Sequence, residues 1–432
     1  MDREKVLCKI RERKYVRRLF LLCWLVYCVS YIGRLNYSSA MAQIISERFL
    51  TASQAGFISM VYFFAYGTGQ MINGFLGDRV NPKRMIFVGL FCSGLANAAM
   101  GISHSALCMA LSWGANGYFQ AMIWAPIIRI FAEMLQGEDR VNCSVNIVSS
   151  QIIGTLIAYL LSAGVLAVAA WPGVFIAAAI LLAAASILWS IGFWDVCRHA
   201  ENDSPQDGGI KEKYKQEEAP VQLSFGKLMT TSGILTLLIP IMVHGMLKDG
   251  VTSWVPTYIS DSFGITASFS VLLTSILPVI NLSGAYLARF VYQKTGERIG
   301  VSIFFFFTWA AAGLLLLCTA GKLFPVITAC ILAMITASMM AVNTLVVNIY
   351  PLRFLRYGRV SGVSGFLNAM AYLGTAISTF TIGLMVEYRG WQTTIYIWLV
   401  VTVLAGLLCL IFIKTESKGS ICAVSGDGKE RI

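Results

Sequence analysis

The segment LFLLCWLVYCVSYIGRLNYSSAMAQ, residues 19–43, is a long apolar run whose second half contains an arginine, Arg34. A helix of this length crosses the ~30 Å hydrocarbon core of a bilayer, because each residue adds ~1.5 Å along the axis. Moving a guanidinium group into hydrocarbon costs at least ~2.5–3.5 kcal/mol. Arg34 therefore either reaches the membrane interface or faces a polar interior that uses its charge.

Similar apolar runs recur along the whole chain. Of the 432 residues, 57% are hydrophobic and 13% are charged, whereas a soluble domain carries about 25% charged residues. The predicted fold class is therefore an all-α integral membrane protein. We expect twelve transmembrane helices, near residues 19–43, 54–77, 85–103, 106–134, 142–169, 171–194, 232–258, 268–292, 299–320, 323–350, 360–386 and 392–413.

One long polar stretch, HAENDSPQDGGIKEKYKQEE at residues 199–218, separates these spans into six and six. Connections elsewhere are short. The predicted organisation has four parts: an N-terminal six-helix half (1–195), a cytoplasmic linker (196–227), a C-terminal six-helix half (228–414) and a cytoplasmic tail (415–432).

The distribution of basic residues predicts the orientation in the membrane. Most of the 33 Lys and Arg residues fall in the tails and in connections on the same side as the tails, and Arg48, Lys322 and Arg389 are the ones expected on the opposite side. Cytoplasmic connections carry an excess of Lys and Arg, so both termini are expected in the cytoplasm. The net charge of +11 then reflects membrane topology, and no nucleic-acid partner is expected.

The two halves show weak internal repetition. The pattern Ile-Ser-x-x-Phe follows the first span at residues 45–49 and the seventh span at residues 259–263. The same offset carries Arg34 onto Lys248. Related halves of this kind place a substrate site near the bilayer midplane, so the two cations are expected at equivalent positions in two pseudo-symmetric halves.

The spacing of polar residues around Arg34 indicates a cavity wall. Tyr27, Tyr31, Arg34 and Ser38 fall on one helical stripe, at steps of four, three and four residues. The alternative is that Arg34 extends outward and the tyrosines form an interfacial belt. We favour the cavity because the repeat supplies a second cation, Lys248, and two cations facing one cavity make an anion site.

Four motifs resemble the organophosphate:phosphate antiporters of the major facilitator superfamily, typified by glycerol-3-phosphate and hexose-phosphate transporters. They are YIGRLNYSSAM at 31–41, GFLGDRVNPKR at 74–84, IWAPIIR at 123–129 and LKDGVTSWVPTYI at 247–259. The second contains a loop general to the superfamily, while the others are more specific. The resemblance covers nearly the whole chain and implies the major facilitator fold.

The resemblance also implies a substrate site. In that family an arginine on span one and another on span seven bind the phosphoryl group, and this pattern falls on Arg34 and Lys248. The tyrosines that precede the first arginine in the family correspond to Tyr27 and Tyr31. We therefore expect all four residues to bind substrate.

Three positions depart from the family pattern. The span-seven cation is Lys248 and not arginine, Leu35 stands where the glycerol-phosphate type has lysine, and Gln151 stands where that type has a histidine on span five. Lysine presents a point charge, whereas arginine grips two oxygens in a plane. Anion binding is expected to survive these changes, but the particular substrate does not follow from them.

Two further residues near Lys248 have open roles. His244 precedes it by one helical turn and could respond to phosphate protonation, although a packed, hydrogen-bonded histidine is the alternative. Asp249 follows it and could tune the lysine, carry a proton or contact the substrate, with a simple salt bridge or cap as the alternative. Both are retained as expected substrate-site residues.

A second group is expected to take part in gating. Arg129 and Glu133 form an i, i+4 pair near the inner end of span four. We interpret them, with the loop after span two, as a latch between conformational states in preference to a substrate contact. The expected gating residues are Gly74, Asp78, Arg79, Arg129 and Glu133.

The sequence predicts a transporter and no enzyme. It lacks a GxxxxGK[ST] nucleotide-binding loop, so transport is expected to be secondary. Its eleven cysteines are scattered without a CxxC pair, and we expect no metal or cofactor.

The expected function is exchange of small organic phosphates for inorganic phosphate by alternating access, in a bacterial inner membrane and as a monomer. Two alternatives stay open. One is a membrane sensor of a sugar phosphate with little transport, and the other is a transporter of another organic anion.

Overall fold

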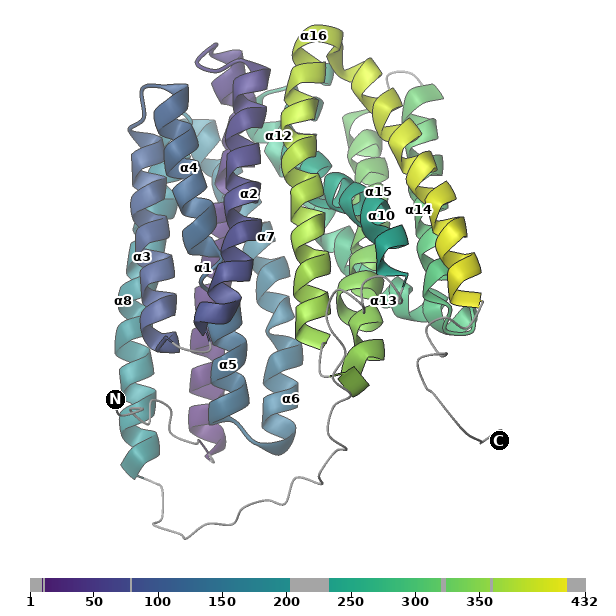
Figure 1. Ribbon diagram of the computed structural model, residues 1–432. Coiled ribbons are helices and arrows are strands. Elements are labelled where there is room, and N and C mark those ends of the chain that lie inside the picture. Colours follow the sequence, from purple (N-terminus) through teal and green to yellow (C-terminus); the bar gives the residue numbers. More distant parts are fainter. Residues whose placement is uncertain are drawn as a thin grey trace, which may run out of the picture. The chain divides into compact units, whose positions relative to one another are not determined.

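The computed structural model describes residue 10 and residues 12–77, 80–202, 233–319, 324–357 and 360–417 (Figure 1). These residues are helical apart from short connections, and none of them lies in a β-strand. The elements are α1 (Arg13–Ser46), α2 (Ala52–Gly77), α3 (Pro82–Gly101), α4 (Ala106–Gln120), α5 (Trp124–Met134), α6 (Gly137–Asn146), α7 (Val148–Val168), α8 (Pro172–Asn202), α10 (Ile234–Gly245), η1 (Met246–Gly250), α11 (Val251–Phe263), α12 (Ala267–Thr274), α13 (Ile276–Lys294), α14 (Ile299–Thr319), α15 (Pro325–Asn343), η2 (Thr344–Ile349), η3 (Tyr350–Tyr357) and α16 (Val360–Ser417).

The predicted all-α membrane class is confirmed. Within the described ranges, nine helical stretches are long and apolar enough to cross a bilayer. The last, Gly362–Glu416, contains two of the expected spans, because Gly390 has φ 74° and ψ 177° and breaks the helical path within α16. Helix α2 and the pair α4–α5 occupy the two expected spans outside those nine stretches, so the helices are consistent with twelve spans.

The structure divides the expected span over residues 106–134 into two helices, α4 and α5. The backbone N–H groups of Met122 and Ile123 bond the carbonyls three residues earlier, at 3.1 and 3.4 Å, and not four residues earlier. Pro126 lies in the first turn of α5 and has no N–H to continue the ladder. The helix is therefore interrupted at this point of span four.

The described residues pack as two compact units that do not coincide with the predicted halves. The first contains the described parts of Met1–Glu212, Ser253–Val279 and Ala376–Tyr388, and the second those of Lys213–Thr252, Ile280–Thr375 and Arg389–Ile432. The predicted six-helix halves, 1–195 and 228–414, stay a prediction. Residues 203–227 of the expected linker and 418–432 of the expected tail lie outside the described residues.

In the first unit, α1 packs against α7 and α8, while α4 packs against α2 and α3. Figure 1 shows α2, α3 and α4 side by side. Fully buried aromatic side chains fill the spaces between these helices, including Trp113, Trp189, Phe131 and Phe175. This packing fixes the faces of α1 and α2 that carry the polar residues described below.

Segments from the C-terminal part of the sequence join the first unit through direct polar contacts. The Ser38 hydroxyl donates to the Ser253 carbonyl at 2.6 Å, and the Ser268 hydroxyl donates to the Ala163 carbonyl at 2.8 Å. At the start of α2, the Ser53 N–H donates to the Glu387 carboxylate at 2.8 Å. These contacts connect α1, α2 and α7 with α11, α12 and α16.

Two glycines allow the closest approach between α2 and α16 in this unit. A Cβ on Gly56 would lie 2.6 Å from the Thr379 carbonyl oxygen, and a Cβ on Gly383 would overlap the Ala52 carbonyl. Small residues let helix backbones meet in this way. Any side chain at either position would force the two helices apart.

Candidate anion-binding site

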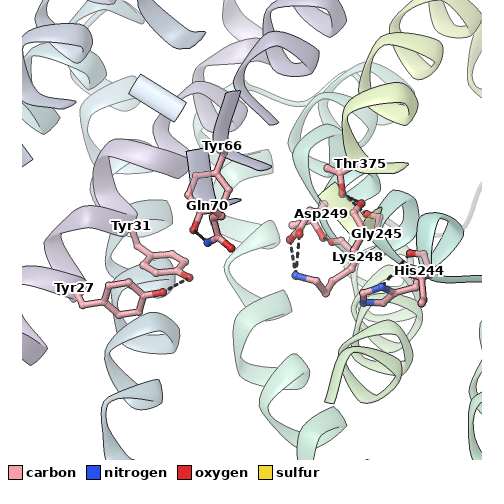
Figure 2. Close-up of polar contacts among 12 residues, drawn as sticks. Tyr27, Tyr31, Tyr66, Gln70, His244, Gly245, Lys248, Asp249 and Thr375 are labelled. Carbon is pink, nitrogen blue, oxygen red and sulfur yellow. Dashed lines mark hydrogen bonds and ion pairs between the residues drawn. The ribbon is translucent and has the colours of Figure 1, made fainter. Parts of the chain in front are cut away.

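Arg34 and the two tyrosines before it share one face of α1, as the spacing predicted. The Tyr27 and Tyr31 hydroxyl oxygens are 3.5 Å apart, and their rings meet edge to face with centroids 5.4 Å apart (Figure 2). Both tyrosines are buried, with relative exposures of 8% and 7%. They therefore do not form the exposed interfacial belt that was the alternative for this stripe.

The Arg34 guanidinium lies against two aromatic rings. Its central carbon is 5.5 Å from the Tyr31 ring centroid and 4.4 Å from the Tyr66 ring centroid, which belongs to α2. Cation–π contacts of this kind contribute about 0.5–2 kcal/mol, more when water is excluded. The two rings thus hold the guanidinium in place on this face of α1.

Sequence reasoning missed Tyr66 and its neighbour Gln70. The Gln70 side-chain amide donates to the Tyr66 hydroxyl at 2.9 Å, one helical turn along α2 (Figure 2). Nothing in the local sequence assigns either residue to Arg34, because the rotation of α2 relative to α1 is set by tertiary packing. The i, i+4 spacing of tyrosine and glutamine in an apolar helix is the only signal that could have drawn attention to them.

A buried amide network fixes the backbone of α1 next to Arg34. Asn97 and Asn116 donate to the Gly33 carbonyl at 3.2 and 2.8 Å, and Gln120 donates to the Ser30 carbonyl at 3.1 Å. Unpaired amides are costly inside a membrane protein, so such groups hold their partners firmly. The network connects α3 and α4 to the turn of α1 that carries Tyr31 and Arg34.

In the second unit, Lys248 and Asp249 form an ion pair. The lysine Nζ lies 2.9 Å from Oδ1 and 2.8 Å from Oδ2 of the aspartate (Figure 2). The side chains are 16% and 23% exposed. This contact fits two of the roles left open for Asp249, tuning of the lysine and a simple salt bridge, and its place in the substrate site stays a prediction.

This pair sits on a π-helical turn, η1, between α10 and α11. A π turn widens the helix locally and often occurs at functional sites. The carbonyl of Lys248 accepts the hydroxyl of Thr252 one turn later. The turn therefore changes the direction in which Lys248 and Asp249 project from the helix.

A tight crossing between α10 and α16 holds the π turn. A Cβ on Gly245 would lie 2.6 Å from the carbonyl carbon of Ala371, and a Cβ on Gly374 would lie 2.6 Å from the Met242 carbonyl carbon. The Thr375 hydroxyl hydrogen-bonds to the Gly245 carbonyl at 2.9 Å (Figure 2). Backbone contact and this hydrogen bond together fix the helix immediately before Lys248.

His244 is fully buried one turn before Lys248. Its Nδ1 lies 3.3 Å from the Ile241 carbonyl oxygen. Among the described residues, no hydrogen-bond partner reaches its Nε2 atom. The burial fits a packed histidine, and the expected place of His244 in the substrate site stays a prediction.

The other predicted substrate-site and gating residues lie on α7, α2 and α5 or outside the described residues. Gln151 is half-buried on α7, and its backbone carbonyl accepts the Thr155 hydroxyl. Gly74 has open space around it, since no atom of the described residues outside its own helix backbone and chain neighbours lies within 4 Å of an added Cβ. Asp78 and Arg79 lie outside the described residues.

The predicted pair of Arg129 and Glu133 is present on α5. Arg129 Nε donates to Glu133 Oε1 at 2.6 Å, and a terminal guanidinium nitrogen donates to the Val80 carbonyl at 3.0 Å. Val80 lies two residues before the start of α3, in the connection that follows α2. The pair therefore ties α5 to that connection, and its role in gating stays a prediction.

Comparisons with known proteins give matches to membrane transporters. The family model described as Major Facilitator Superfamily matches residues 23–364. A probable hexose phosphate transport protein of Chlamydia pneumoniae is 30% identical over 48% of this chain and 44% of its own length. A glycerol-3-phosphate transporter of Bacillus subtilis is 24% identical over 58% of each chain. The match thus spans less than two thirds of either transporter.

Two further matches extend over nearly the whole chain. The membrane sensor protein UhpC of Salmonella typhimurium is 21% identical over 94% of this chain and 93% of its own. Among solved structures, a bacterial homologue of the human lysosomal transporter Spinster, inward-facing and unoccupied, has a TM-score of 0.76 at 15% identity. It covers 94% of this chain and 99% of its own. At this identity the likeness concerns the fold alone.

Proposed function

Because the chain belongs to the Major Facilitator Superfamily, we propose that it transports small organic phosphates in exchange for inorganic phosphate, by alternating access. Its relatives include a probable hexose phosphate transport protein and a glycerol-3-phosphate transporter, so the predicted resemblance to the organophosphate:phosphate antiporters is confirmed. The chain is a multi-pass membrane protein of a transporter superfamily, and we propose no enzymatic activity for it.

The observation that supports this proposal most directly is the position of the Arg34 guanidinium on α1. Arg34 lies against the rings of Tyr31 and Tyr66, and the hydroxyls of Tyr27 and Tyr31 lie on the same helix face. A guanidinium can grip two phosphoryl oxygens at once, and phenol hydroxyls can donate to a third. We propose that Lys248, at the equivalent position of the sequence repeat, is a second cation that binds phosphate.

Alternating access is supported by the contacts in the first unit. Gly56 and Gly383 bring the backbones of α2 and α16 together, and Ser53 connects the start of α2 to Glu387. These helices come from opposite ends of the chain. We propose that such contacts separate and re-form as the protein changes the side from which its site is reached.

A sensor function is the second candidate. The observation that favours it is the match over 94% of the chain to a protein named as a membrane sensor. The two functions differ in whether the bound anion crosses the membrane. Counterflow of labelled phosphate into phosphate-loaded proteoliposomes supports transport, whereas sugar-phosphate binding without counterflow supports a sensor. Competition by other organic anions against phosphate uptake identifies the cargo class.

The site assignment is tested by changing the charge of Lys248. We expect Lys248→Arg to keep exchange and to lower the apparent KM for phosphate without raising the maximal rate, because a tighter grip does not speed release. We expect Lys248→Gln to lose exchange, since it keeps polarity and approximate bulk but removes the charge. The measurement is the initial exchange rate over a range of phosphate concentrations, corrected for protein amount. A parent-like Lys248→Gln protein would remove Lys248 from the site.

We also propose that both termini face the cytoplasm of a bacterial inner membrane, with the chain acting as a monomer. Membrane-impermeant maleimide should label a Lys322→Cys protein in intact cells above the background of the parent. It should label a Pro205→Cys protein only after the membrane is opened. The reverse pattern would contradict this orientation, which rests on the excess of basic residues in cytoplasmic connections.

A further inference from the structure

We propose that Asp249 is the internal counter-ion of Lys248, that a substrate anion displaces it on binding, and that re-forming the pair lets the unloaded protein change its access state. This inference rests on the proposed function, since it deepens the role of Lys248 in that site. It concerns a residue whose role the sequence left open.

The geometry favours competition over a passive salt bridge. Both carboxylate oxygens lie within 2.9 Å of the lysine Nζ, so Asp249 engages the ammonium in the way a phosphoryl group would. Lysine has three donors and is a compact charge, and it cannot hold two anions closely at once without strong repulsion between them. Phosphate therefore binds Lys248 by moving Asp249 aside.

The position of the pair on the π turn brings Asp249 close to Lys248. In a regular α-helix, consecutive side chains diverge by about 100°. The π turn Met246–Gly250 contains more residues per turn and thus reduces that angle. The crossing of α10 with α16 at Gly245 holds the turn in position. The fold therefore places a carboxylate next to the proposed substrate cation.

The pair also matters when the site is empty. An unpaired ammonium is costly to move through a low-dielectric interior. Phosphate neutralises Lys248 in the loaded protein, and Asp249 neutralises it in the unloaded one. Exchange requires only the loaded protein to reorient, whereas net flow also requires the unloaded protein to reorient. Asp249 is therefore needed for net flow and dispensable for exchange.

The test compares three measurements in Asp249→Asn and in the parent: phosphate binding to purified protein, phosphate exchange, and net phosphate efflux from proteoliposomes. We expect the variant to bind phosphate about tenfold more tightly and to exchange it with a lower KM, because the competing anion is gone. We expect net efflux, relative to exchange, to fall by about tenfold or more. A purely structural salt bridge would instead weaken binding when broken.

Matched variants separate charge from position. Asp261→Asn removes the same charge from an exposed residue on α11 and should leave all three measurements unchanged. Asp249→Glu keeps a carboxylate and should restore the parent ratio of efflux to exchange. If the yield of folded Asp249→Asn protein is low, Asp249→Ser removes the carboxylate with a smaller side chain. We expect the same results from it in all three measurements.

The outcomes distinguish this inference from the proposed function. If Lys248→Gln leaves phosphate binding unchanged, the lysine is not in the substrate site and the proposed site fails. If Lys248→Gln loses binding while Asp249→Asn binds phosphate no better than the parent, or keeps the parent ratio of efflux to exchange, only the counter-ion role is overturned.

Discussion

Replacing Arg34 by glutamine should reduce phosphate exchange by about 100-fold or more while the protein still inserts in the membrane. Each hydrogen bond from a charged donor contributes about 1.5–3 kcal/mol, and losing two of them corresponds to at least two factors of ten. Glutamine keeps a polar side chain, which is shorter than that of arginine and has no charge for a phosphoryl group. The measurement is the initial rate of labelled-phosphate exchange in proteoliposomes, corrected for the amount of inserted protein.

The same substitution should not lower thermal stability in detergent. Arg34 is a half-buried cation, and removing its charge relieves a desolvation cost, which opposes the loss of its contacts with Tyr31 and Tyr66. Loss of function with unchanged or higher stability is the signature of a binding residue. A large loss of stability together with activity would instead assign Arg34 a structural role.

Two controls define what Arg34 contributes. Arg34→Lys keeps the charge but loses the planar fork, so we expect partial exchange with a raised KM. Arg48→Gln removes a charge from an exposed residue just after α1 and should behave like the parent. If Arg34→Gln exchanges phosphate like the parent, Arg34 is not part of the substrate site. The main support for phosphate transport is then lost.

The sequence was sufficient to predict the face of α1 on which Arg34 lies. Tyr27, Tyr31 and Arg34 are related by local helical spacing, which needs no knowledge of the other helices. Tyr66 was missed because its contact with Arg34 depends on how α2 packs against α1 and α4. That rotation is fixed by contacts far apart in the chain, such as the bond between Asn116 and the Gly33 carbonyl.

The geometry around Lys248 could not be predicted from the sequence, for a similar reason. Regular helical spacing separates Lys248 from Asp249 by about 100°, which suggested several roles for the aspartate. The structure inserts a π turn there, next to the Gly245 backbone that contacts Ala371. The sequence pattern identified Lys248 and Asp249 as candidates. Their relative orientation depends on a helix crossing with residues more than 100 positions later in the chain.

Replacing Gly374 by alanine tests that crossing and should cost both stability and exchange. An added Cβ would lie 2.6 Å from the carbonyl carbon and Cα of Met242, which are backbone atoms that cannot rotate away. The helices must then separate, and overpacking of this kind destabilises a protein by about 1–3 kcal/mol. Separation also loosens the bond between Thr375 and the Gly245 carbonyl, which holds the turn before Lys248.

Gly365→Ala is the matched control on the same helix. Among the described residues, no atom outside its own helix backbone and chain neighbours lies within 4 Å of a Cβ added there, and alanine in a helix is favoured over glycine by about 1 kcal/mol. We therefore expect a small gain in thermal stability and parent-like exchange from Gly365→Ala, against lower stability and exchange reduced by about tenfold or more from Gly374→Ala. Equal behaviour of the two variants would mean that α10 and α16 do not approach this closely in the working protein. The position of Lys248 and Asp249 would then have to be set by something other than the crossing.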